Sequence, residues 1–525
     1  MSGKKPGERL RLGIDVGGTN TDAALLSGRE VVATAKSFTT PDVRSGVVSA
    51  VTRILEQSGV RRDAIEAVMI GTTQFVNAFV QRRDLAEVAI LRVSLPKADG
   101  VPPLAGWPED AARAVGEHIY MVGGGSYYTG QDYAPLDEEA IRQAALDAHG
   151  KGLRTVAISA NFAPIRPDLE HRARDIVRKV MPDALITLSS DVGGIGLIDR
   201  ENAAIINASL AGLGARVVRS LESAIQDLSI RAPVFISQND GTLITTNTAA
   251  MLPILTCSSG PTNSIRGAAF LTGLADAIVV DIGGTTTDIG FVTRGFPRET
   301  TAANYIGGVR TNFRMPDVLS IGVGGGSHVR EIDGGWKVGP DSVGFRLLEE
   351  GQIFGGSTLT ASDIAVRAGL ATIGDKSRVR NIPQSVVDAA LESIQVQIEE
   401  AIDQIKVSAA PLPLLLVGGG NIIVARPLKG ASETLRPKHA DVANAVGAAI
   451  ALISGRVDKL YDIPTLGREV ALQMAKDEAK AAAVRAGADA NHVEIVEVIE
   501  LPMMHMRAGA TQIKVRAVGP VAVLA

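Results

Sequence analysis

An eight-residue segment occurs twice in this chain, and the two copies lie about half the chain apart. The first copy is DVGGTNTD at residues 15–22, and the second is DIGGTTTD at residues 281–288. Each copy stands between short apolar runs, which predicts a strand, a glycine turn and a second strand. A repeat of this kind indicates two similar halves that each open with the same hairpin.

The residue types in this repeat suit the binding of phosphate groups. Paired glycines let the backbone approach a ligand closely, and successive turn N–H groups form a concavity for phosphate oxygens. Threonine hydroxyls add donors, and an aspartate at the strand end offers a hard oxygen for Mg²⁺. The alternative is an ordinary tight hairpin turn, in which the second aspartate only orders the backbone. The predicted nucleotide-binding residues of the two turns are Gly17, Gly18, Thr19, Asn20, Gly283, Gly284, Thr285 and Thr286.

Composition excludes several other classes of protein. The formal charge of −4 and the absence of basic clusters argue against binding to nucleic acid or to an anionic membrane. One cysteine excludes a disulfide framework and a cysteine-rich metal site. No P-loop and no well-placed G-x-G-x-x-G occurs. The apolar runs are too short to span a bilayer and no signal peptide is recognised, so we expect a cytoplasmic protein.

The order of predicted elements indicates an α/β architecture in three parts. Helical and strand patterns alternate over residues 136–200, after a glycine-, proline- and tyrosine-rich stretch at 97–135 that is expected to form loops. A long apolar-periodic helix is predicted at 201–228. The predicted division is an N-terminal lobe at 1–200 that contains the loop region 97–135, a second lobe at 201–455, and a small α+β unit at 456–525.

Several segments together resemble the hydantoinase A / 5-oxoprolinase family, within the actin/hexokinase/Hsp70 ATPase superfamily. The resemblance covers about residues 10–455, and its motifs are specific only in combination. The segments that carry it are IDVGGTNTDAAL (14–25), GTTQFVNAFVQRR (71–83), TCSSGPTNSIRGAAFL (256–271), VVDIGGTTTDIGFV (279–292), IGVGGGSHV (321–329) and VGPDSVG (338–344).

This resemblance implies two duplicated actin-like, ribonuclease H-like lobes around an ATP cleft. It also implies an enzyme that uses ATP and Mg²⁺ to phosphorylate the amide oxygen of a hydantoin, lactam or oxoproline, after which water opens the ring. A hydantoinase B-type partner subunit is implied, and a homo- or hetero-oligomer is expected. Two alternatives stay open: a small-molecule kinase of the same superfamily, and an assembly ATPase stimulated by a protein partner.

The resemblance assigns roles to particular residues. Asp15 and Asp281 are the predicted catalytic residues, and with Asp288 they are the predicted ligands of Mg²⁺ or of its waters. The turn after the strand at 412–417 is expected to approach the adenosine, through Gly418, Gly419, Gly420 and Asn421. The predicted substrate residues are Thr72, Thr73, Asn77, Gly325, Ser327 and His328.

Structural alternatives remain for several of these positions. Gly71-Thr72-Thr73 could cap the helix that follows instead of directing its N-terminus at an anion. Residues 418–421 could form a tight strand exit, and His328 could be a loop histidine without a role. Ser258-Ser259-Gly260 is expected to form a loop, and Asn444 is assigned to a helix with small residues that permit close packing.

Overall fold

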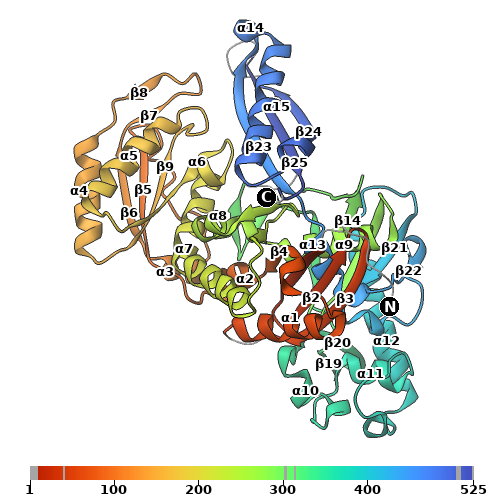
Figure 1. The fold of residues 1–525 in the computed structure, drawn as a ribbon. Helices are drawn as coiled ribbons and strands as arrows, with labels where there is room; N and C mark the ends of the chain where they lie inside the picture. The colour runs from red at the N-terminus through yellow and green to blue at the C-terminus, as the bar shows by residue number, and fades with distance from the viewer. Residues whose placement is uncertain (1–9, 40–41, 301–303, 313–314, 504–509, 523–525) are drawn as a thin grey trace.

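The computed structural model describes residues 10–39, 42–300, 304–312, 315–503 and 510–522. Three larger sheets organise the chain, with helices packed on and between them (Figure 1). No helix among the described residues is long and apolar enough to cross a membrane.

The first copy of the repeat forms a hairpin near one edge of a nine-stranded sheet. β1 pairs antiparallel with β2, and Asp15 lies directly opposite Asp22 in that pairing. On its other side β1 pairs in parallel with β4, which in turn pairs in parallel with β11. The strands of this part of the sheet are β3 (Glu30–Phe38), β2 (Asn20–Ser27), β1 (Leu10–Val16), β4 (Ile65–Thr72), β11 (Val234–Ser237) and β12 (Leu243–Thr245).

The second copy builds a six-stranded sheet with the same arrangement. Its two strands pair antiparallel with Asp281 opposite Asp288, and the first strand pairs in parallel with β21, which pairs in parallel with β22. The predicted duplication is therefore confirmed at the level of strand order. The strands are β15 (Phe296–Pro297), β14 (Thr287–Thr293), β18 (Val318–Ile321), β13 (Ala277–Ile282), β21 (Leu412–Val417) and β22 (Ala431–Leu435).

Two helices, α9 (Ser259–Thr272) and α13 (Ala443–Ala449), lie between the two sheets. They cross so closely that a Cβ on Gly267 would lie 1.8 Å from the carbonyl oxygen of Ala443. A Cβ on Gly447 would lie 1.8 Å from the carbonyl oxygen of Asn263. Glycine is therefore required at this crossing, as the small-residue pattern of the second helix predicted. The expected loop at Ser258–Gly260 is wrong, because the helix already begins at Ser259.

A separate four-stranded sheet contains β6 (His118–Gly123), β5 (Val88–Leu95), β9 (Thr155–Ala160) and β10 (Leu185–Leu188), and lies to one side in Figure 1. The expectation of loops throughout 97–135 is wrong, because this stretch holds α3 (Glu109–Val115), β6, β7 (Gly125–Ser126) and β8 (Asp132–Ala134). The four residues of β6 that precede Val122 are only partly buried or exposed, so the strand lacks a clear apolar alternation.

A buried ion pair joins this smaller sheet to the long helix α7 (Leu197–Asp227). Arg92 of β5 binds Glu201 of the helix through two hydrogen bonds of 2.8 and 2.5 Å, and both side chains are almost fully buried. Ser159 donates a third hydrogen bond to Glu201, at 2.7 Å. This satisfied network fixes the orientation of the small sheet on the helix.

The C-terminal strands extend the first sheet instead of forming a separate unit. β23 (Ile453–Asp462) pairs with β12, β25 (Ala510–Gly519) pairs with β23, and β24 (Glu494–Pro502) forms the edge. The helix α15 (Arg468–Arg485) packs on these strands through a row of buried alanines at positions 471, 475, 479 and 483. β11 and β12 also belong to the first sheet, although they lie within 201–455, the range predicted for the second lobe. The strands are therefore grouped differently from the predicted lobes.

The remaining elements surround these sheets. Two short hairpins lie in the part of the chain between β15 and α10 (Leu347–Glu350). The remaining helices are α1 (Arg44–Ser58), α2 (Gln74–Val80), α4 (Glu138–Gly150), α5 (Pro167–Val180), α6 (Ser189–Val192), α8 (Thr246–Met251), α10 (Leu347–Glu350), α11 (Ala361–Arg367), α12 (Gln384–Ile405) and α14 (Ile463–Leu466). The remaining strands are β16 (Asn304–Ile306), β17 (Val309–Thr311), β19 (Ser327–Ile332) and β20 (Gly335–Ser342).

Candidate active site

The glycine turns of the two repeat hairpins face each other. In each turn the first glycine donates its N–H to a carbonyl three residues later, at 3.0 Å in the first copy and 2.9 Å in the second. A Cβ on Gly284 would lie 3.3 Å from the hydroxyl oxygen of Thr19, so the turns are in contact range. The predicted pair of opposed phosphate-binding turns is thus brought together by the fold.

Asp15 is buried at the end of β1 and is held by two asparagines from the helices between the sheets. Asn263 of α9 donates to Asp15 Oδ1 at 3.4 Å, and Asn444 of α13 donates to Asp15 Oδ2 at 3.1 Å. Burial raises the pKa of Asp15 to about 7, and the nearby charge of Asp22 adds to that rise, while the two asparagines oppose it. A carboxyl with this pKa can exchange a proton at neutral pH.

Asp22, the last residue of the first repeat, takes part in the same network. Asn444 donates to its Oδ2 at 2.9 Å, and Lys36 of β3 donates to its Oδ1 at 2.6 Å. Lys36 also donates to the backbone carbonyl of Asp441 at 3.0 Å. Asp22 therefore orders the hairpin and ties it to the segment before α13, and Lys36 places a positive charge close to the turns.

The equivalent carboxylates of the second repeat also have raised pKa values. Burial raises the pKa of Asp281, while a hydrogen bond from Ser264 of α9 opposes the shift. Burial raises the pKa of Asp288 to about 7, with a hydrogen bond from Ser320 opposing and the charge of Asp281 adding to it. Both repeats thus direct carboxyls with perturbed pKa values toward the space between the sheets, a pattern found at functional sites.

A glycine lies against each strand-end aspartate, on or just after the neighbouring parallel strand. A Cβ on Gly71 of β4 would lie 2.3 Å from Asp15 Oδ1, and a Cβ on Gly418 would lie 2.2 Å from Asp281 Oδ1. Gly418 follows directly after Val417, which is the register partner of Asp281. Any larger residue at these positions would collide with the carboxylate. Glycine is therefore required there for space as well as for backbone flexibility.

Two further glycine loops pack on the second turn. The N–H groups of Gly325 and Gly326 donate to the carbonyls of Gly283 and Gly284, at 3.0 and 2.7 Å. From the other loop, Gly420 donates to the carbonyl of Ile282 at 2.7 Å, and Asn421 donates to the carbonyl of Gly418 at 2.6 Å. The predicted residues at 324–326 and 418–421 therefore surround the turn at 283–286.

The predicted substrate residues fall into two groups. Thr73 and Asn77 lie beside the first turn, because Asn77 donates to Thr73 Oγ1 at 3.4 Å and a Cβ on Gly18 would lie 4.0 Å from Asn77 Nδ2. Thr72 Oγ1 accepts from the N–H of Gln74 at 3.2 Å, but Thr73, the N-cap residue of α2, makes no side-chain capping bond, so the capping alternative stays open.

The second group lies beside the other turn, and its side chains are engaged locally. Ser327 is buried, and its hydroxyl accepts from the N–H of Gly324 at 2.8 Å, which holds the glycine loop. His328 contacts Arg330, and partial burial together with that neighbouring charge lowers the pKa of His328. These contacts give both side chains a structural role, and a substrate role for them stays a prediction.

Sequence reasoning did not anticipate Asn263 or Lys36 as site residues. Asn263 lies inside a motif that was recognised, but its amide could be assigned to Asp15 only after the helix was placed between the sheets. Lys36 has no motif around it, and it reaches the site because β3 is the next strand of the hairpin sheet. Among the described residues, no three His, Cys, Asp or Glu side chains stand close enough to hold a metal ion directly.

The fold and the opposed turns define a two-lobed α/β protein with a duplicated strand–turn–strand motif. Family models described as the hydantoinase/oxoprolinase N-terminal region and hydantoinase/oxoprolinase match residues 11–181 and 200–371, respectively. The chain therefore belongs to the hydantoinase/oxoprolinase family, as its sequence motifs predicted.

Relatives of known name share part of this chain. It is 27% identical over 363 residues to caprolactamase subunit alpha of Pseudomonas jessenii, which covers 64% of this chain and 51% of that protein. It is 25% identical over 393 residues to the acetone carboxylase beta subunit of Xanthobacter autotrophicus, which covers 67% of this chain and 53% of that one. The chain thus spans about half the length of the curated relatives it matches.

Two solved structures share the fold over nearly the whole chain. The ATP-dependent caprolactamase from Pseudomonas jessenii superposes with a TM-score of 0.76 at 20% identity, covering 98% of this chain and 89% of that one. Nucleotide-free acetone carboxylase superposes with a TM-score of 0.73 at 19% identity and the same coverage. These matches confirm the predicted fold class.

Proposed function

We propose that this chain is an ATP-dependent enzyme, or the ATP-using subunit of one, that phosphorylates and opens a cyclic amide. The single observation that carries the proposal is the pair of opposed glycine turns, with Gly284 next to Thr19 and a perturbed aspartate behind each turn. Backbone N–H groups of such turns suit phosphate oxygens from both sides. The printed name of one matched structure, an ATP-dependent caprolactamase, supports the same reaction class.

The chemistry assigned to the aspartates follows from their surroundings. A lactam carbonyl is a poor electrophile, and transfer of a phosphoryl group to its oxygen creates a good leaving group. Asp15 is assigned as the general base, because its pKa of about 7 lets it take a proton from an attacking water at neutral pH. Lys36, which donates to Asp22 at 2.6 Å, supplies positive charge near the transferring phosphoryl group.

The carboxylates near the turns also fit a Mg²⁺ ion that is bound through its water molecules. Asp15, Asp281 and Asp288 provide hard oxygen atoms around the turns, but not as a cluster of three that could ligate an ion directly. An ion that keeps several water molecules and binds phosphate oxygens suits this arrangement. We therefore assign these aspartates to hold such an ion through its waters, where it would neutralise phosphate charge.

A partner subunit is part of the proposal. The matched caprolactamase and acetone carboxylase chains are each named as one subunit of a larger enzyme, alpha and beta respectively. This chain covers about half of each of them. We propose that a hydantoinase B-type subunit completes the reaction, and that the working enzyme is a hetero-oligomer.

The test is a phosphate-release assay with ATP, Mg²⁺ and a panel of hydantoins, lactams and oxoprolines, with and without a co-encoded partner subunit. Equal release of phosphate and ring-opened product is the expected result, and Asp15→Ala should abolish both. A phosphorylated metabolite as the final product would identify a kinase instead. ATP hydrolysis that depends only on a protein partner would identify an assembly ATPase.

A further inference from the structure

Polar residues stand at the ends of neighbouring strands in the first sheet, at the same edge as Asp15. β1, β4 and β11 are neighbouring parallel strands, so their carboxyl ends lie at the same edge. Ligands of open α/β sheets bind outside this edge. Gln238 and Asn239, both buried, directly follow β11, which lies two strands from β1, or about 10 Å at the usual strand spacing.

The first turns of α9 connect this second strand end with Asp15. Thr262 donates its hydroxyl to the backbone carbonyl of Asn239 at 2.8 Å, and the next residue, Asn263, donates to Asp15 Oδ1 at 3.4 Å. Two successive residues of one helix therefore contact the end of β11 and the catalytic carboxyl.

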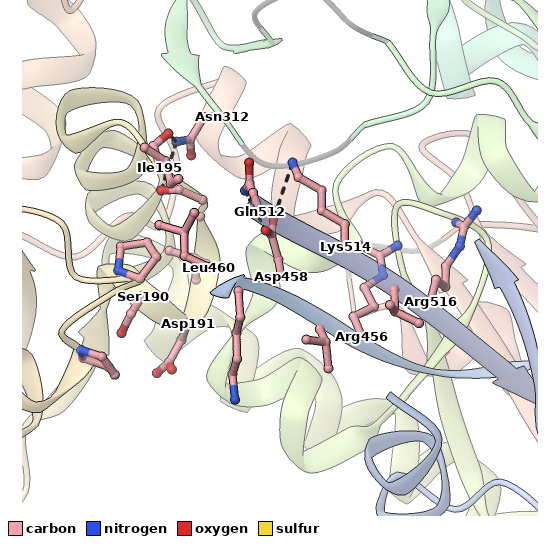
Figure 2. A pocket seen from close by; sticks show the side chains of 18 of the residues that line it. Ser190, Asp191, Ile195, Asn312, Arg456, Asp458, Leu460, Gln512, Lys514 and Arg516 are labelled. Atoms are coloured by element: carbon pink, nitrogen blue, oxygen red, sulfur yellow. Dashed lines mark hydrogen bonds and ion pairs between the residues drawn. The ribbon is translucent and has the colours of Figure 1, made fainter. Parts of the chain in front are cut away.

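A cavity of about 630 Å³ opens beside Gln238 and Asn239. A volume of this size accommodates a small metabolite. One wall comes from the segment after β10, with Ser190, Asp191 and Ile195, and the opposite wall comes from β23 and β25 (Figure 2). None of the residues predicted from the sequence lines this cavity.

The wall formed by β23 and β25 is a ladder of polar cross-strand pairs. Arg456 lies opposite Arg516, Asp458 opposite Lys514, and Leu460 opposite Gln512, and all six line the cavity. The carboxylate of Asp458 has partners within the ladder, because Gln512 donates to it at 2.6 Å and the Lys514 ammonium lies 3.5 Å away.

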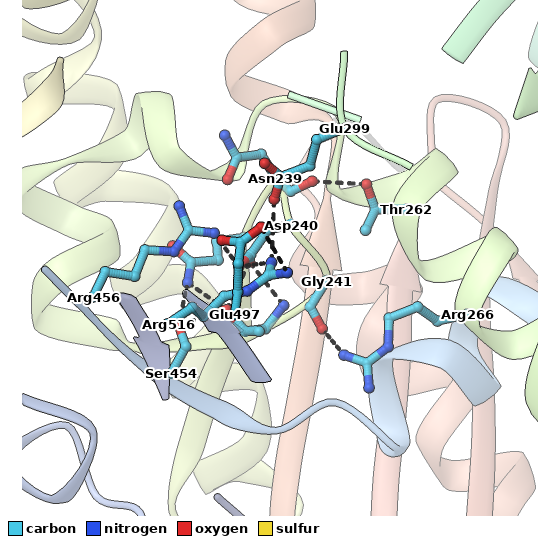
Figure 3. A network of polar contacts seen from close by, with 12 residues as sticks. Asn239, Asp240, Gly241, Thr262, Arg266, Glu299, Ser454, Arg456, Glu497 and Arg516 are labelled. Atoms are coloured by element: carbon cyan, nitrogen blue, oxygen red, sulfur yellow. Dashed lines mark hydrogen bonds and ion pairs between the residues drawn. The ribbon is translucent and has the colours of Figure 1, made fainter. Parts of the chain in front are cut away.

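Two arginines directly opposite each other repel, so the pair Arg456 and Arg516 needs a counter-charge. Asp240, from the turn between β11 and β12, is buried and binds both (Figure 3). Burial alone would raise the pKa of Asp240, but the two arginines hold it well below its usual range.

One buried carboxylate is thus shared between two guanidinium groups, and Arg516 has two further carboxylates within 4.0 Å. Glu299 lies 3.2 Å and Glu497 4.0 Å from Arg516, while the side chain of Arg456 is 33% exposed and has only Asp240 as an ion-pair partner in the described residues. Arg266 of α9 is also buried, and its guanidinium donates to the backbone carbonyl of Gly241. Arg456 is therefore the group at this end of the cavity that is suited to bind an anionic group.

We propose that this cavity binds the molecule that accepts the phosphoryl group, and that Arg456 and Lys514 select an acceptor that carries a carboxylate. The inference rests on the proposed function for the identity of the reaction, and on the cavity for the binding site. The end of β11 lies at the arginine end of the ladder, because Asp240 directly follows Asn239. The carboxylate of the acceptor would lie beside Arg456 and Lys514, and its ring amide beside Gln238 and Asn239. Guanidinium and ammonium groups form strong charge-assisted hydrogen bonds with a carboxylate.

Binding can be measured with two ligands that differ only in the carboxylate, 5-oxoproline and 2-pyrrolidinone. Calorimetric titration into the full chain, with and without a non-hydrolysable ATP analogue, should give at least about tenfold tighter binding of 5-oxoproline. Lys514→Met should remove most of this preference. The exposed lysine of α15, Lys480, provides the matched control as Lys480→Met.

A second variant fills the cavity without disturbing the arginine cluster. A Cβ on Gly194 meets only Asp458, at 3.8 Å, so Gly194→Leu should fold and occupy the space. Gly150→Leu, at an exposed position with nothing within 4 Å of its Cβ, is the control. Binding of both ligands should fall at least about tenfold in Gly194→Leu and stay unchanged in Gly150→Leu.

The outcomes separate this inference from the proposed function. Failure of the native chain to bind 5-oxoproline, or equal binding by Gly194→Leu, overturns the assignment of the cavity. Turnover of ATP with a cyclic amide and an unchanged KM in Gly194→Leu also overturns it, while leaving the proposed function intact. Binding that depends on Gly194 and Lys514 without any turnover supports the site and contradicts the proposed reaction.

Discussion

Asn444 donates a hydrogen bond to Asp15 across 3.1 Å, although 429 positions separate the two residues in the chain. The same amide nitrogen donates to Asp22 at 2.9 Å. One helix between the sheets thus fixes the position of both aspartates of the first repeat.

Replacing Asn444 by alanine should shift the activity profile toward higher pH. The hydrogen bond from Asn444 opposes the burial that raises the pKa of Asp15 to about 7, so its loss should raise that pKa by about one further unit. The measurement is kcat/KM for ATP turnover between pH 5 and 9. Asn491→Ala, at an exposed site, is the control. An unchanged profile in Asn444→Ala would exclude Asp15 as the titrating base.

The Asp15→Asn variant should become more stable relative to the native chain as the pH rises. The pKa of Asp15 is higher in the folded state than its unfolded value, so its contribution to stability is present below about pH 4 and is lost as the pH rises through 7. The free energy of unfolding of Asp15→Asn, relative to the native chain, should therefore increase by about 4 kcal/mol between pH 4 and pH 8.

Denaturant titrations at several pH values measure this difference. The same variant should have no ATP turnover, since an amide cannot act as a base. A pH-independent difference in stability would show that Asp15 titrates normally in the folded protein.

Replacing Gly418 by alanine should displace Asp281 and the backbone of Ile282 beside it. A Cβ at this position would lie 2.2 Å from Asp281 Oδ1, and the φ angle of +81° is unfavourable for alanine. The carboxyl must move, and a displacement of about 1 Å can reduce turnover about 100-fold. Gly100→Ala, where a Cβ would meet nothing within 4 Å, is the control for single-turnover measurements. Native rates in Gly418→Ala would contradict the role given to Asp281.

Replacing Gly267 by alanine should destabilise the contact between α9 and α13. The added methyl would lie 1.8 Å from the carbonyl oxygen of Ala443, so the two helices must separate, at a cost of about 1–3 kcal/mol. Thermal unfolding followed by circular dichroism measures the loss. Gly212→Ala in α7 is a matched helical control, because the nearest atom to its Cβ is 3.7 Å away. Equal melting temperatures for both variants would refute the close crossing.

Replacing Arg92 by methionine should destabilise the chain by about 3–5 kcal/mol, because Glu201 would be left buried without its ionic partner. The double variant Arg92→Met with Glu201→Leu should recover much of that loss, since no charge then remains buried. Both are measured by denaturant unfolding of the full chain. A double variant as unstable as the single one would show that packing, and not charge, dominates this contact.

The repeated segment by itself determined much of this protein. Two copies of D-x-G-G-T-x-T-D predicted two hairpins, their aspartates and their phosphate-binding turns, because a strand end, a glycine turn and a second strand depend on residues close in sequence. The motifs at 71–83 and 256–271 also identified the family before any contact was known.

Only the tertiary structure decided which distant residues surround those hairpins. Asn263, Asn444 and Lys36 approach Asp15 or Asp22 because two helices pack on the hairpin and β3 pairs with β2, and no local pattern records that packing. The arginine pair 456 and 516 faces Asp240 only because the C-terminal strands extend the first sheet. Contacts between residues hundreds of positions apart depend on the burial of whole sheet faces. A single sequence does not show which faces meet.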